Sequence, residues 1–529
     1  MNRLLHRKVG LLLMIYFGMC DAARILGIAP LQAPSHVIIM TSLFKELALR
    51  GHQMTVIIPT PQKDVPSNYT QITTDINMES VLGGKENMFD LGKMNAVVLS
   101  VFMWYVGNTM TELTLKSPNV QKLLKSNENF DLIIAETFYC EGLLGLSQKF
   151  SVPFVGVSTF SGTENIKDIV GDPFPYSYVP SPFITFNDHM TFFQRLQNTI
   201  TNFLIKNGHN YYFIPAQDAI MRKYLTDIPN LSKLRDIVYN ASLLLLNTHF
   251  SHGFSRPKVP NLIEVGGMHI KPPKQLPKDI QEFLDGAEDG AVYFSMGSNL
   301  KSADMSIPKR EAFLRAFAKI KQRVLWKFEE NLPDKPKNVK ISKWFPQSDI
   351  LGHPNIRVFM THGGLLSSQE SMYNAVPLVG IPIFADQSLN VHRAADAGYA
   401  LRLDFDNITE ESVYWALNEV IHNQRYKETA ERVSRIFHDQ PQTPMQQAVF
   451  WVEYVLRHHG ARHLRSAALD LAWYQYYLLD VAAVLLAASG AAVVLLVWLV
   501  ASLAALVLRK PGNKHNKHNK PSKSNKKKK

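Results

Sequence analysis

The first half of the chain alternates short apolar runs with segments of helical spacing. Arg24 to Ala29 is a mainly apolar run of strand length, and apolar residues recur at helical intervals from His36 to Arg50. Ser35 is a candidate cap for this helix, Gly51 follows its end, and Met54 to Pro59 predicts the next strand. A strand, a helix and a strand in so few residues are typical of a doubly wound α/β sheet. Similar runs predict strands at Asp131 to Ala135, Val155 to Val157 and Leu243 to Leu246.

The same alternation returns after a proline-rich segment. Five prolines between Arg256 and Lys278 predict a linker over residues 256–279. At 529 residues the chain is too long for one core, and two domains are expected, over residues 23–255 and 280–446, followed by a helical region over 447–479. The second half has predicted strands at Ala291 to Ser295, Arg323 to Trp326 and Arg357 to Thr361, and predicted helices at Lys309 to Gln322 and Leu365 to Asn374.

Both ends of the chain carry patterns of membrane targeting. Residues 1–22 predict a secretory signal peptide, because basic residues precede an apolar run; an uncleaved anchor or a buried first strand is the alternative. Residues 480–508 predict a transmembrane helix, since Val481 to Leu508 are 28 residues without a charge. The basic tail over 509–529 then lies in the cytosol and the body in the lumen. Its four final lysines match an endoplasmic-reticulum retrieval signal, with contact to anionic lipid as the alternative.

The net charge of +12 is confined to the two ends of the chain. Without the three basic residues among the first eight and the ten after position 508, the remainder carries −1. A near-neutral body offers no basic face for nucleic acid, which is excluded as a partner. Four glycosylation sequons, at Asn68, Asn230, Asn240 and Asn407, fit a luminal body. Cleavage of the signal would leave Cys140 as the only cysteine, without an internal disulfide.

The segment from Trp344 to Gln387 carries the most specific chemistry. Its His-Gly-Gly, at 362–364, stands between a predicted strand and a predicted helix. Glycines there let a ligand approach the start of the helix, where free N–H groups and the helix dipole favour a phosphate. The next apolar run is interpreted as a second strand that ends in Asp-Gln, at 386–387. The pattern indicates a nucleotide pocket.

This segment resembles the signature of the UDP-glycosyltransferase family, whose enzymes move a sugar from a UDP-sugar to a small acceptor. The resemblance extends from Arg24 to Leu508, and the Gly-Gly-Leu-Leu-Ser at 363–367 is most similar to insect members. It implies a GT-B fold, in which two doubly wound Rossmann-like domains face each other across a cleft. The first domain would bind the acceptor and the second the UDP-sugar, with a C-terminal transmembrane helix after them.

The resemblance implies roles for residues around the uracil and the phosphates. Trp344 would stack on the uracil ring, and Gln347 would pair with an edge of the uracil or ribose. His362, when protonated, would help the departing UDP oxygen to carry its charge. Gly364 and Ser367 would belong to the phosphate cradle.

Further family positions surround the two sugars of the donor. Glu370 would accept hydrogen bonds from the ribose hydroxyls, and Asp386 and Gln387 from those of the transferred sugar. Gly297 and Ser298 form a second glycine turn after a strand, and this turn resembles the family turn that faces the donor.

The resemblance also implies a catalytic pair in the first half. His36 matches the general base of the family, which would remove the acceptor proton during a single inverting attack on the sugar carbon. Glu136, at the end of a predicted strand, matches the carboxylate that holds the imidazole, although many relatives have Asp there. Asp131 is the other candidate, but it opens the strand and would lie at the wrong end.

No cofactor or metal is expected, because the UDP-sugar is a co-substrate and no His, Asp or Glu cluster has ligand spacing. Asp404 and Asp406 are interpreted as a turn cap. Glucose is favoured as the transferred sugar, since no Lys or Arg adjoins Asp386 and Arg393 lies well downstream; UDP-glucuronate is the alternative.

The expected acceptor is a small lipophilic compound such as a phenol, so that the function would be detoxification or conjugation. Aromatic residues between 174 and 193 either line its site or pack on the membrane face or in the core. Location in the endoplasmic-reticulum membrane, as a single-pass protein with membrane lipid as a partner, is expected. A homo-oligomer is left open. The competing hypothesis is a non-catalytic membrane protein that sequesters lipophiles.

Overall fold

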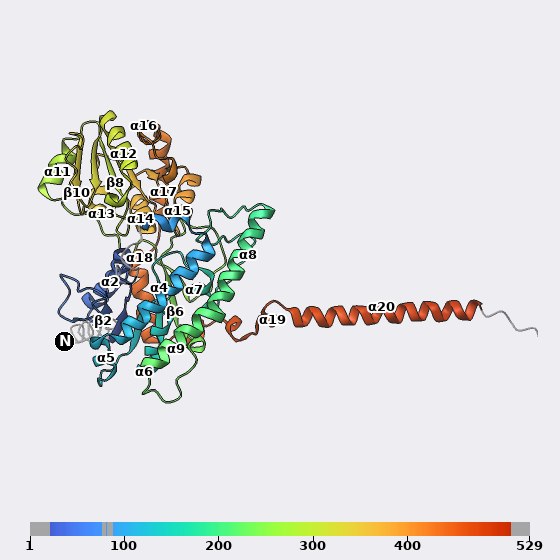
Figure 1. The fold of residues 1–529 in the computed structure, drawn as a ribbon. Helices are drawn as coiled ribbons and strands as arrows, with labels where there is room; N and C mark the ends of the chain where they lie inside the picture. The colour runs from blue at the N-terminus through green and yellow to red at the C-terminus, as the bar shows by residue number, and fades with distance from the viewer. Residues whose placement is uncertain (1–21, 77–80, 82–87, 509–529) are drawn as a thin grey trace, which may run out of the picture. The chain divides into compact units, whose positions relative to one another are not determined.

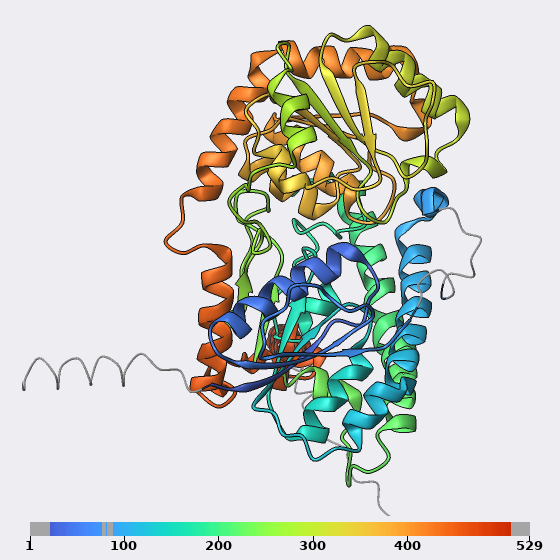
Figure 2. The same cartoon turned by 90° about the vertical axis from the view of Figure 1, so that its left-hand side faces the viewer.

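The computed structural model describes residues 22–76, 81 and 88–508. Two compact units make up the chain, the first ending at Ser466 and the second beginning at Ala467. The first unit contains two parallel sheets, which form the lower and upper halves of the body in Figures 1 and 2. The predicted signal peptide (except Ala22) and the predicted cytosolic tail lie outside the described residues.

The first half is built on a seven-stranded parallel sheet of order β3-β2-β1-β4-β5-β6-β7. Its central strands are mainly apolar because both faces of the sheet are covered by helices, as expected for a doubly wound sheet. The strands are β1 (Arg24–Ile28), β2 (Gln53–Ile58), β3 (Tyr69–Thr73), β4 (Leu132–Glu136), β5 (Phe154–Ser158), β6 (Leu243–Leu246) and β7 (Leu262–Glu264).

The helices of the first half are α2 (Pro34–Leu49), α4 (Ala96–Lys116), α5 (Pro118–Leu124), α6 (Leu146–Phe150), α7 (Glu164–Asp168), α8 (Phe192–Gly208), α9 (Ile214–Tyr224) and α10 (Leu234–Val238). Helix α2 begins at Pro34 with Ala33 as its N-cap, so Ser35 lies inside the helix and is not the predicted cap. Proline is favoured at this first position, because its missing N–H is one that the helix leaves unpaired.

The second half has a six-stranded parallel sheet of order β10-β9-β8-β11-β12-β13. Apolar clusters again cover both faces. The strands are β8 (Ala291–Ser295), β9 (Arg323–Lys327), β10 (Val339–Ser342), β11 (Ile356–Thr361), β12 (Leu378–Gly380) and β13 (Ala400–Arg402). The helices are α11 (Lys278–Asp285), α12 (Ile307–Lys319), α13 (Gln347–Leu351), α14 (Leu365–Tyr373), α15 (Gln387–Ala397), α16 (Glu410–His422) and α17 (Gln424–His438).

Two further details differ from the sequence predictions, and the packing of one helix goes beyond them. The expected linker contains β7, which pairs with β6 and completes the first sheet. Strand β12 ends at Gly380, so that Asp386 and Gln387 do not end a strand but stand at the start of α15. Helix α18 (Pro444–Arg457) returns to the first half, where Val449 and Val452 join the core beside α2 (Figure 2).

The second unit contains α19 (Trp473–Tyr476) and α20 (Leu479–Leu508). Helix α20 has 30 residues, and an 18-residue stretch of it has a mean hydropathy of 2.8, so it is long and apolar enough to cross a membrane. It begins two residues before the predicted uncharged run and ends with it.

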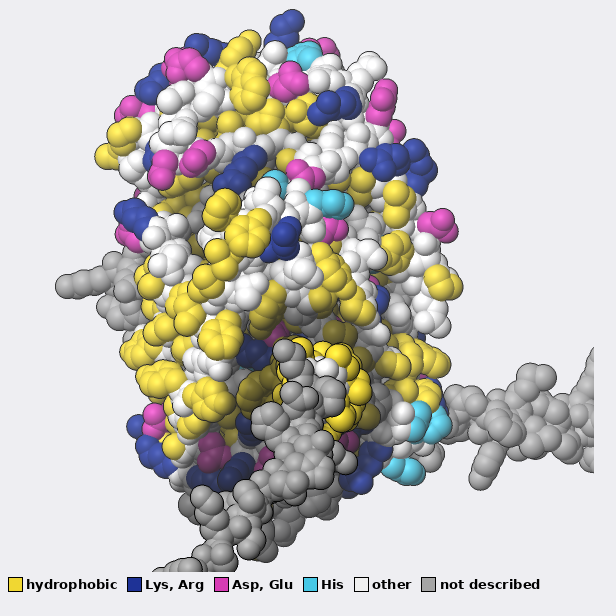
Figure 3. All heavy atoms as spheres, turned by 90° about the vertical axis from the view of Figure 1, so that its right-hand side faces the viewer, with side chains coloured by type: hydrophobic (Ala, Val, Ile, Leu, Met, Phe, Trp, Pro, Cys, Tyr) yellow, Lys and Arg dark blue, Asp and Glu magenta, His cyan; other side chains and the backbone are white. Residues whose placement is uncertain are grey.

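One surface of the first half is unusually apolar. Phe192 and Phe193 at the start of α8 have exposed fractions of 63% and 78%, and Ile200 and Phe203 of the same helix are also exposed. Tyr105 of α4 is exposed as well, and Figure 3 shows hydrophobic side chains gathered on the side of the body that faces right in Figure 1. This part of the aromatic stretch therefore lies on the surface and does not pack in the core.

Candidate functional site

The first sheet brings His36 and Glu136 to the same edge. His36 lies in the first turn of α2, which follows β1, and Glu136 is the last residue of β4. Strands β1 and β4 are parallel neighbours, so residues that follow their carboxyl ends meet at one edge of the sheet. Asp131, the alternative partner, precedes β4 at the opposite edge, where its Oδ2 accepts a hydrogen bond of 2.7 Å from the Arg24 amide.

A third side chain joins this pair. The Nδ1 of His36 contacts the Oε1 of Glu136 across 100 residues of chain. The Oγ1 of Thr159 lies 2.9 Å from the same nitrogen and donates a hydrogen bond of 3.1 Å to the same carboxylate oxygen. Glu136 is buried, while the His36 side chain keeps 18% of its surface exposed. With Nδ1 engaged, Nε2 is the ring nitrogen left for a ligand.

An aromatic wall extends from His36. Its imidazole meets the edge of Phe138 at 4.9 Å between centroids, Phe138 meets Phe160 at 5.3 Å, and Phe160 stacks on Phe183 at 6.3 Å. Of these, only Phe183 belongs to the aromatic stretch that the sequence indicated. The described geometry thus gives His36 an apolar neighbourhood on one side.

His362 follows β11, and two glycines make room for its ring. A Cβ on Gly297 would lie 2.3 Å from Cε1 of His362, and one on Gly364 would lie 2.6 Å from its Nε2. Burial, together with the charge of Lys327, lowers the pKa of His362 to about 4. This lowered pKa favours the neutral imidazole near pH 7. A neutral ring still offers one N–H to an anion.

Gln347, Ser367 and Glu370 are gathered at the start of α13 and along α14. The Nε2 of Gln347 donates to the Oγ of Ser367 at 3.0 Å and also to the Oε2 of Glu370. Burial raises the pKa of Glu370 to about 7. Its Oε1 lies 3.7 Å from Nε2 of His269, a buried histidine whose pKa burial lowers to about 3. Sequence reasoning did not single out His269.

Asp386 and Gln387 are held at the start of α15. Burial raises the pKa of Asp386, opposed by a hydrogen bond from Asn390 and by the charges of His36 and Arg393. The Oε1 of Gln387 already accepts from two backbone amides of its own loop, at 2.9 and 3.1 Å. Gln387 therefore has its amide N–H groups, rather than its oxygen, left for a ligand.

Trp344 and Lys327 lie at the carboxyl edge of the second sheet. Trp344 is 60% exposed, which leaves its indole open to stacking. The Nζ of Lys327 lies 6.0 Å from the Trp344 ring centroid and pairs with Glu329 at 2.6 Å. Sequence reasoning did not single out Lys327, although a cation at the end of a buried strand can be recognised as a candidate site residue. Ser298 is half-buried in the turn with Gly297.

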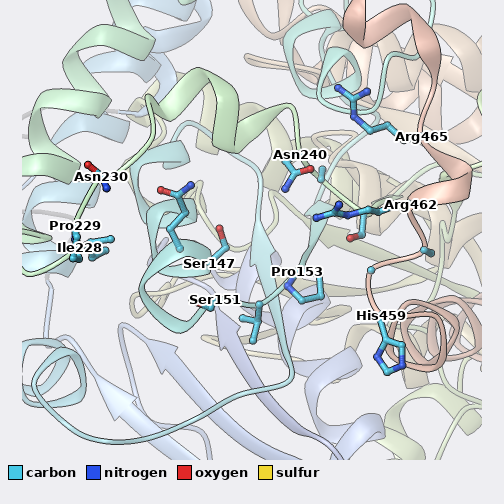
Figure 4. Close-up of a pocket in the computed structure, with 16 residues that line it drawn as sticks. Ser147, Ser151, Pro153, Ile228, Pro229, Asn230, Asn240, His459, Arg462 and Arg465 are labelled. Atoms are coloured by element: carbon cyan, nitrogen blue, oxygen red, sulfur yellow. The ribbon is translucent and has the colours of Figure 1, made fainter.

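A cavity of about 540 Å³ lies away from these residues, at the amino edge of the first sheet (Figure 4). Pro153 precedes β5 and Ser242 precedes β6 in its wall. The exposed sequon residues Asn230 and Asn240 also line it. Asn68 differs, because its Nδ2 donates to two backbone carbonyls at 2.8 Å and so fastens the end of α2.

The described residues contain no group of three or more His, Cys, Asp or Glu arranged to hold a metal ion. The absence of a cofactor stays a prediction. Asp404 caps the short helix Phe405–Asn407 by accepting from the Asp406 amide, which confirms the turn-cap interpretation.

Two doubly wound halves whose carboxyl edges carry a histidine–carboxylate pair and a glycine-lined helix start define a GT-B transferase. Solved structures of this fold match: a UDP-glucosyltransferase from Polygonum tinctorium, in a complex with 3,4-dichloroaniline, has a TM-score of 0.56 at 15% identity, with 83% of this chain and 99% of that chain covered. The family described as "UDP-glucoronosyl and UDP-glucosyl transferase" matches residues 24–518. The chain belongs to the UDP-glycosyltransferase family and is an enzyme of that class.

Curated relatives include insect and mammalian proteins. The chain is 38% identical to UDP-glycosyltransferase UGT5 of Dactylopius coccus, with 87% of this chain and 88% of that protein covered. It is 36% identical to UDP-glucuronosyltransferase 2B19 of Macaca fascicularis, with 86% and 88% covered. The predicted family and fold class are thereby confirmed. The relatives bear names for both glucosyl and glucuronosyl transfer, so they leave the donor sugar open.

Proposed function

We propose that this enzyme transfers glucose, with inversion, from UDP-glucose to a hydroxyl group of a small lipophilic acceptor. The contact of His36 with the buried Glu136 carries this proposal. A histidine so held has its free Nε2 available as a general base, and the carboxylate stabilises the imidazolium that forms.

The reaction follows from the two halves of the site. The acceptor O–H gives its proton to His36 Nε2 while the oxygen forms a bond to the anomeric carbon. The bond from that carbon to the UDP oxygen breaks, and UDP leaves with the electron pair. His362, Gly364, Ser367 and the free N–H groups of α14 receive the growing negative charge of the diphosphate.

The rest of the donor occupies the residues gathered on the second half. Trp344 stacks on the uracil, Gln347 and Glu370 bind the ribose, and Asp386 accepts from hydroxyls of the transferred sugar. Gln387 donates to that sugar through its amide, and the Gly297–Ser298 turn faces the phosphates. The gathering of Gln347, Ser367 and Glu370 by hydrogen bonds supports this assignment. No metal takes part.

UDP-glucuronate is the second candidate donor, and one observation favours it. Arg393 lies near enough to Asp386 to lower its pKa, although seven residues separate them in the sequence. Its guanidinium stacks over Phe254 at 4.4 Å. Arg393 is thus closer to the sugar site than the sequence indicated, and a guanidinium suits a sugar carboxylate.

The acceptor proposal rests on the aromatic wall beside His36. Phe138, Phe160 and Phe183 offer flat apolar surfaces to a phenol while its hydroxyl meets Nε2. Detoxification or conjugation of lipophiles is the corresponding role. Helix α20 anchors the protein in the endoplasmic-reticulum membrane, with the body in the lumen.

The test is turnover of a simple phenol by microsomes that carry this chain, with UDP-glucose and UDP-glucuronate supplied in parallel. Transfer from UDP-glucose alone supports the first proposal, and transfer from UDP-glucuronate alone replaces it with the second. A His36→Ala variant should lose turnover while it still binds UDP. Wild-type turnover by that variant would refute His36 as the base. Protease protection of the body without detergent tests the luminal orientation.

A further inference from the structure

A hydrogen-bond chain connects the donor-binding helix to the catalytic pair. The Nε2 of Gln369, on α14, donates to the Oδ1 of Asn247 at 3.0 Å. The Nδ2 of Asn247 then donates to the backbone oxygen of Thr159 at 2.9 Å. Thr159 in turn contacts both His36 and Glu136 through its hydroxyl. The chain therefore runs from the second half into the first and ends at the proposed base.

Every member of this chain is buried. The exposed fractions are 1% for Gln369, 0% for Asn247 and 4% for Thr159. Buried amides that lose a partner destabilise the protein, because water cannot replace the missing hydrogen bond. The Oε1 of Gln369 is one such unpaired atom. An apolar pair could fill the same space without this liability, so stability alone does not account for two amides here.

The two ends of this hydrogen-bond chain lie in different parts of the site, one on the donor-binding helix α14 and the other beside the catalytic pair. Gln369 is adjacent to Glu370 on α14, the helix whose start follows Gly364. Asn247 directly follows β6 and Thr159 directly follows β5, and these strands are parallel neighbours in the first sheet. The backbone N–H of Asn247 also donates a hydrogen bond of 3.0 Å to the Ser158 carbonyl oxygen, which connects the two strand ends. A displacement of α14 would therefore also displace the segment that contains Thr159.

We propose that Gln369 and Asn247 are positioning residues that keep the catalytic pair in register with the donor-binding helix. The proposal rests on the proposed function, since it gives His36 and Glu136 their roles. The amide chain fixes the Thr159 carbonyl, and through it the hydroxyl that orients Glu136 and His36. Alignment of base, acceptor and sugar carbon then depends on α14 being in its donor-binding place.

The first experiment replaces Gln369 by Met, which keeps the length of the side chain and removes its donor. At saturating phenol and UDP-sugar, kcat should fall about tenfold, because small misplacements of reacting groups have large effects on rate. The Kd for UDP should stay within about twofold, since Gln369 is not among the residues that hold the donor. Asn247→Leu should behave in the same way.

A double-mutant cycle separates coupling from simple loss of stability. Thr159→Val removes the hydroxyl group in which the hydrogen-bond chain ends. Gln369→Met should therefore have no further effect on kcat in that background. Asn247→Leu combined with Gln369→Leu replaces both amides by apolar groups, which should recover part of the thermal stability lost in the single variants while kcat stays low. Gln217→Met is the matched control, because Gln217 is fully buried and bonds Asn108 and Gly142 instead. It should lower thermal stability without changing kcat.

Several outcomes would overturn the proposal. Wild-type kcat in Gln369→Met and Asn247→Leu would show that the chain has no effect on catalysis. Full additivity with Thr159→Val, or a recovery of kcat in the apolar double variant, would show a purely structural role. Failure of the proposed function is distinguishable, since it requires His36→Ala to retain turnover whatever the amides do.

Discussion

Replacing Glu136 by Gln tests the catalytic pair with little change of shape. The wild-type carboxylate is buried, contacts His36 Nδ1 and accepts from Thr159. A negative charge about 4 Å from an imidazolium contributes about 4 kcal/mol at an effective dielectric constant of about 20. Since about 1.4 kcal/mol corresponds to a factor of ten in rate, kcat should fall about a thousandfold.

The assay is steady-state transfer to a phenol at saturating UDP-sugar, together with UDP binding measured by calorimetry. The Kd for UDP should stay near the wild-type value, because Glu136 belongs to the first half and the donor residues to the second. A thermal midpoint close to that of the wild type shows that the variant is folded. If kcat falls less than about tenfold in such a variant, Glu136 does not stabilise the base and the reasoning is refuted.

Three further predictions concern the donor site. Burial raises the pKa of Glu370 to about 7, and Glu370 binds ribose as a carboxylate. The KM for UDP-sugar should therefore rise about tenfold per pH unit below pH 7 and level off above it. A flat profile of KM from pH 5 to 9 would contradict this prediction. Gly297→Ala places a methyl group 2.3 Å from the His362 ring, at a residue whose φ is +85°. The ring must move, and the Kd for UDP, measured by titration calorimetry, should rise about tenfold or more. Trp344→Ala should raise the KM for UDP-sugar about tenfold through lost stacking, with no fall in thermal midpoint because the side chain is 60% exposed; an unchanged KM would remove Trp344 from the uracil site.

The periodicity of apolar residues predicted most of the fold. Strand β8 and helix α14 were predicted within one residue of their observed bounds, since continuous apolar runs and glycine boundaries mark buried parallel strands and helix starts. Strand β7 was missed because three residues among prolines give no periodicity. Helix α18 was expected as a helix, but its return to the first half depends on packing that no local pattern expresses.

The site could be predicted only where a motif marks it. His36, Glu136 and the Gly-Gly turn stand at strand ends in recognisable sequence, and the structure brings the first two into contact. Thr159 and His269 have no motif, because their roles arise from contacts across 123 and 101 residues of chain. The lowered pKa of His362 was also beyond the sequence, since it results from burial and from the charge of Lys327.

The position of helix α18 means that the core of the first half cannot be completed until the second half has been synthesised. One face of the first sheet is covered partly by Val449, Val452 and Val455, which are made roughly 180 residues after β7 is complete. At about 5–20 residues per second, that sheet waits about 10–40 s with apolar surface uncovered. Exposed apolar surface of this kind favours aggregation, and a chain cut before Pro444 would lack these core residues altogether. Completion of the first-half core therefore depends on residues that are synthesised after the second half.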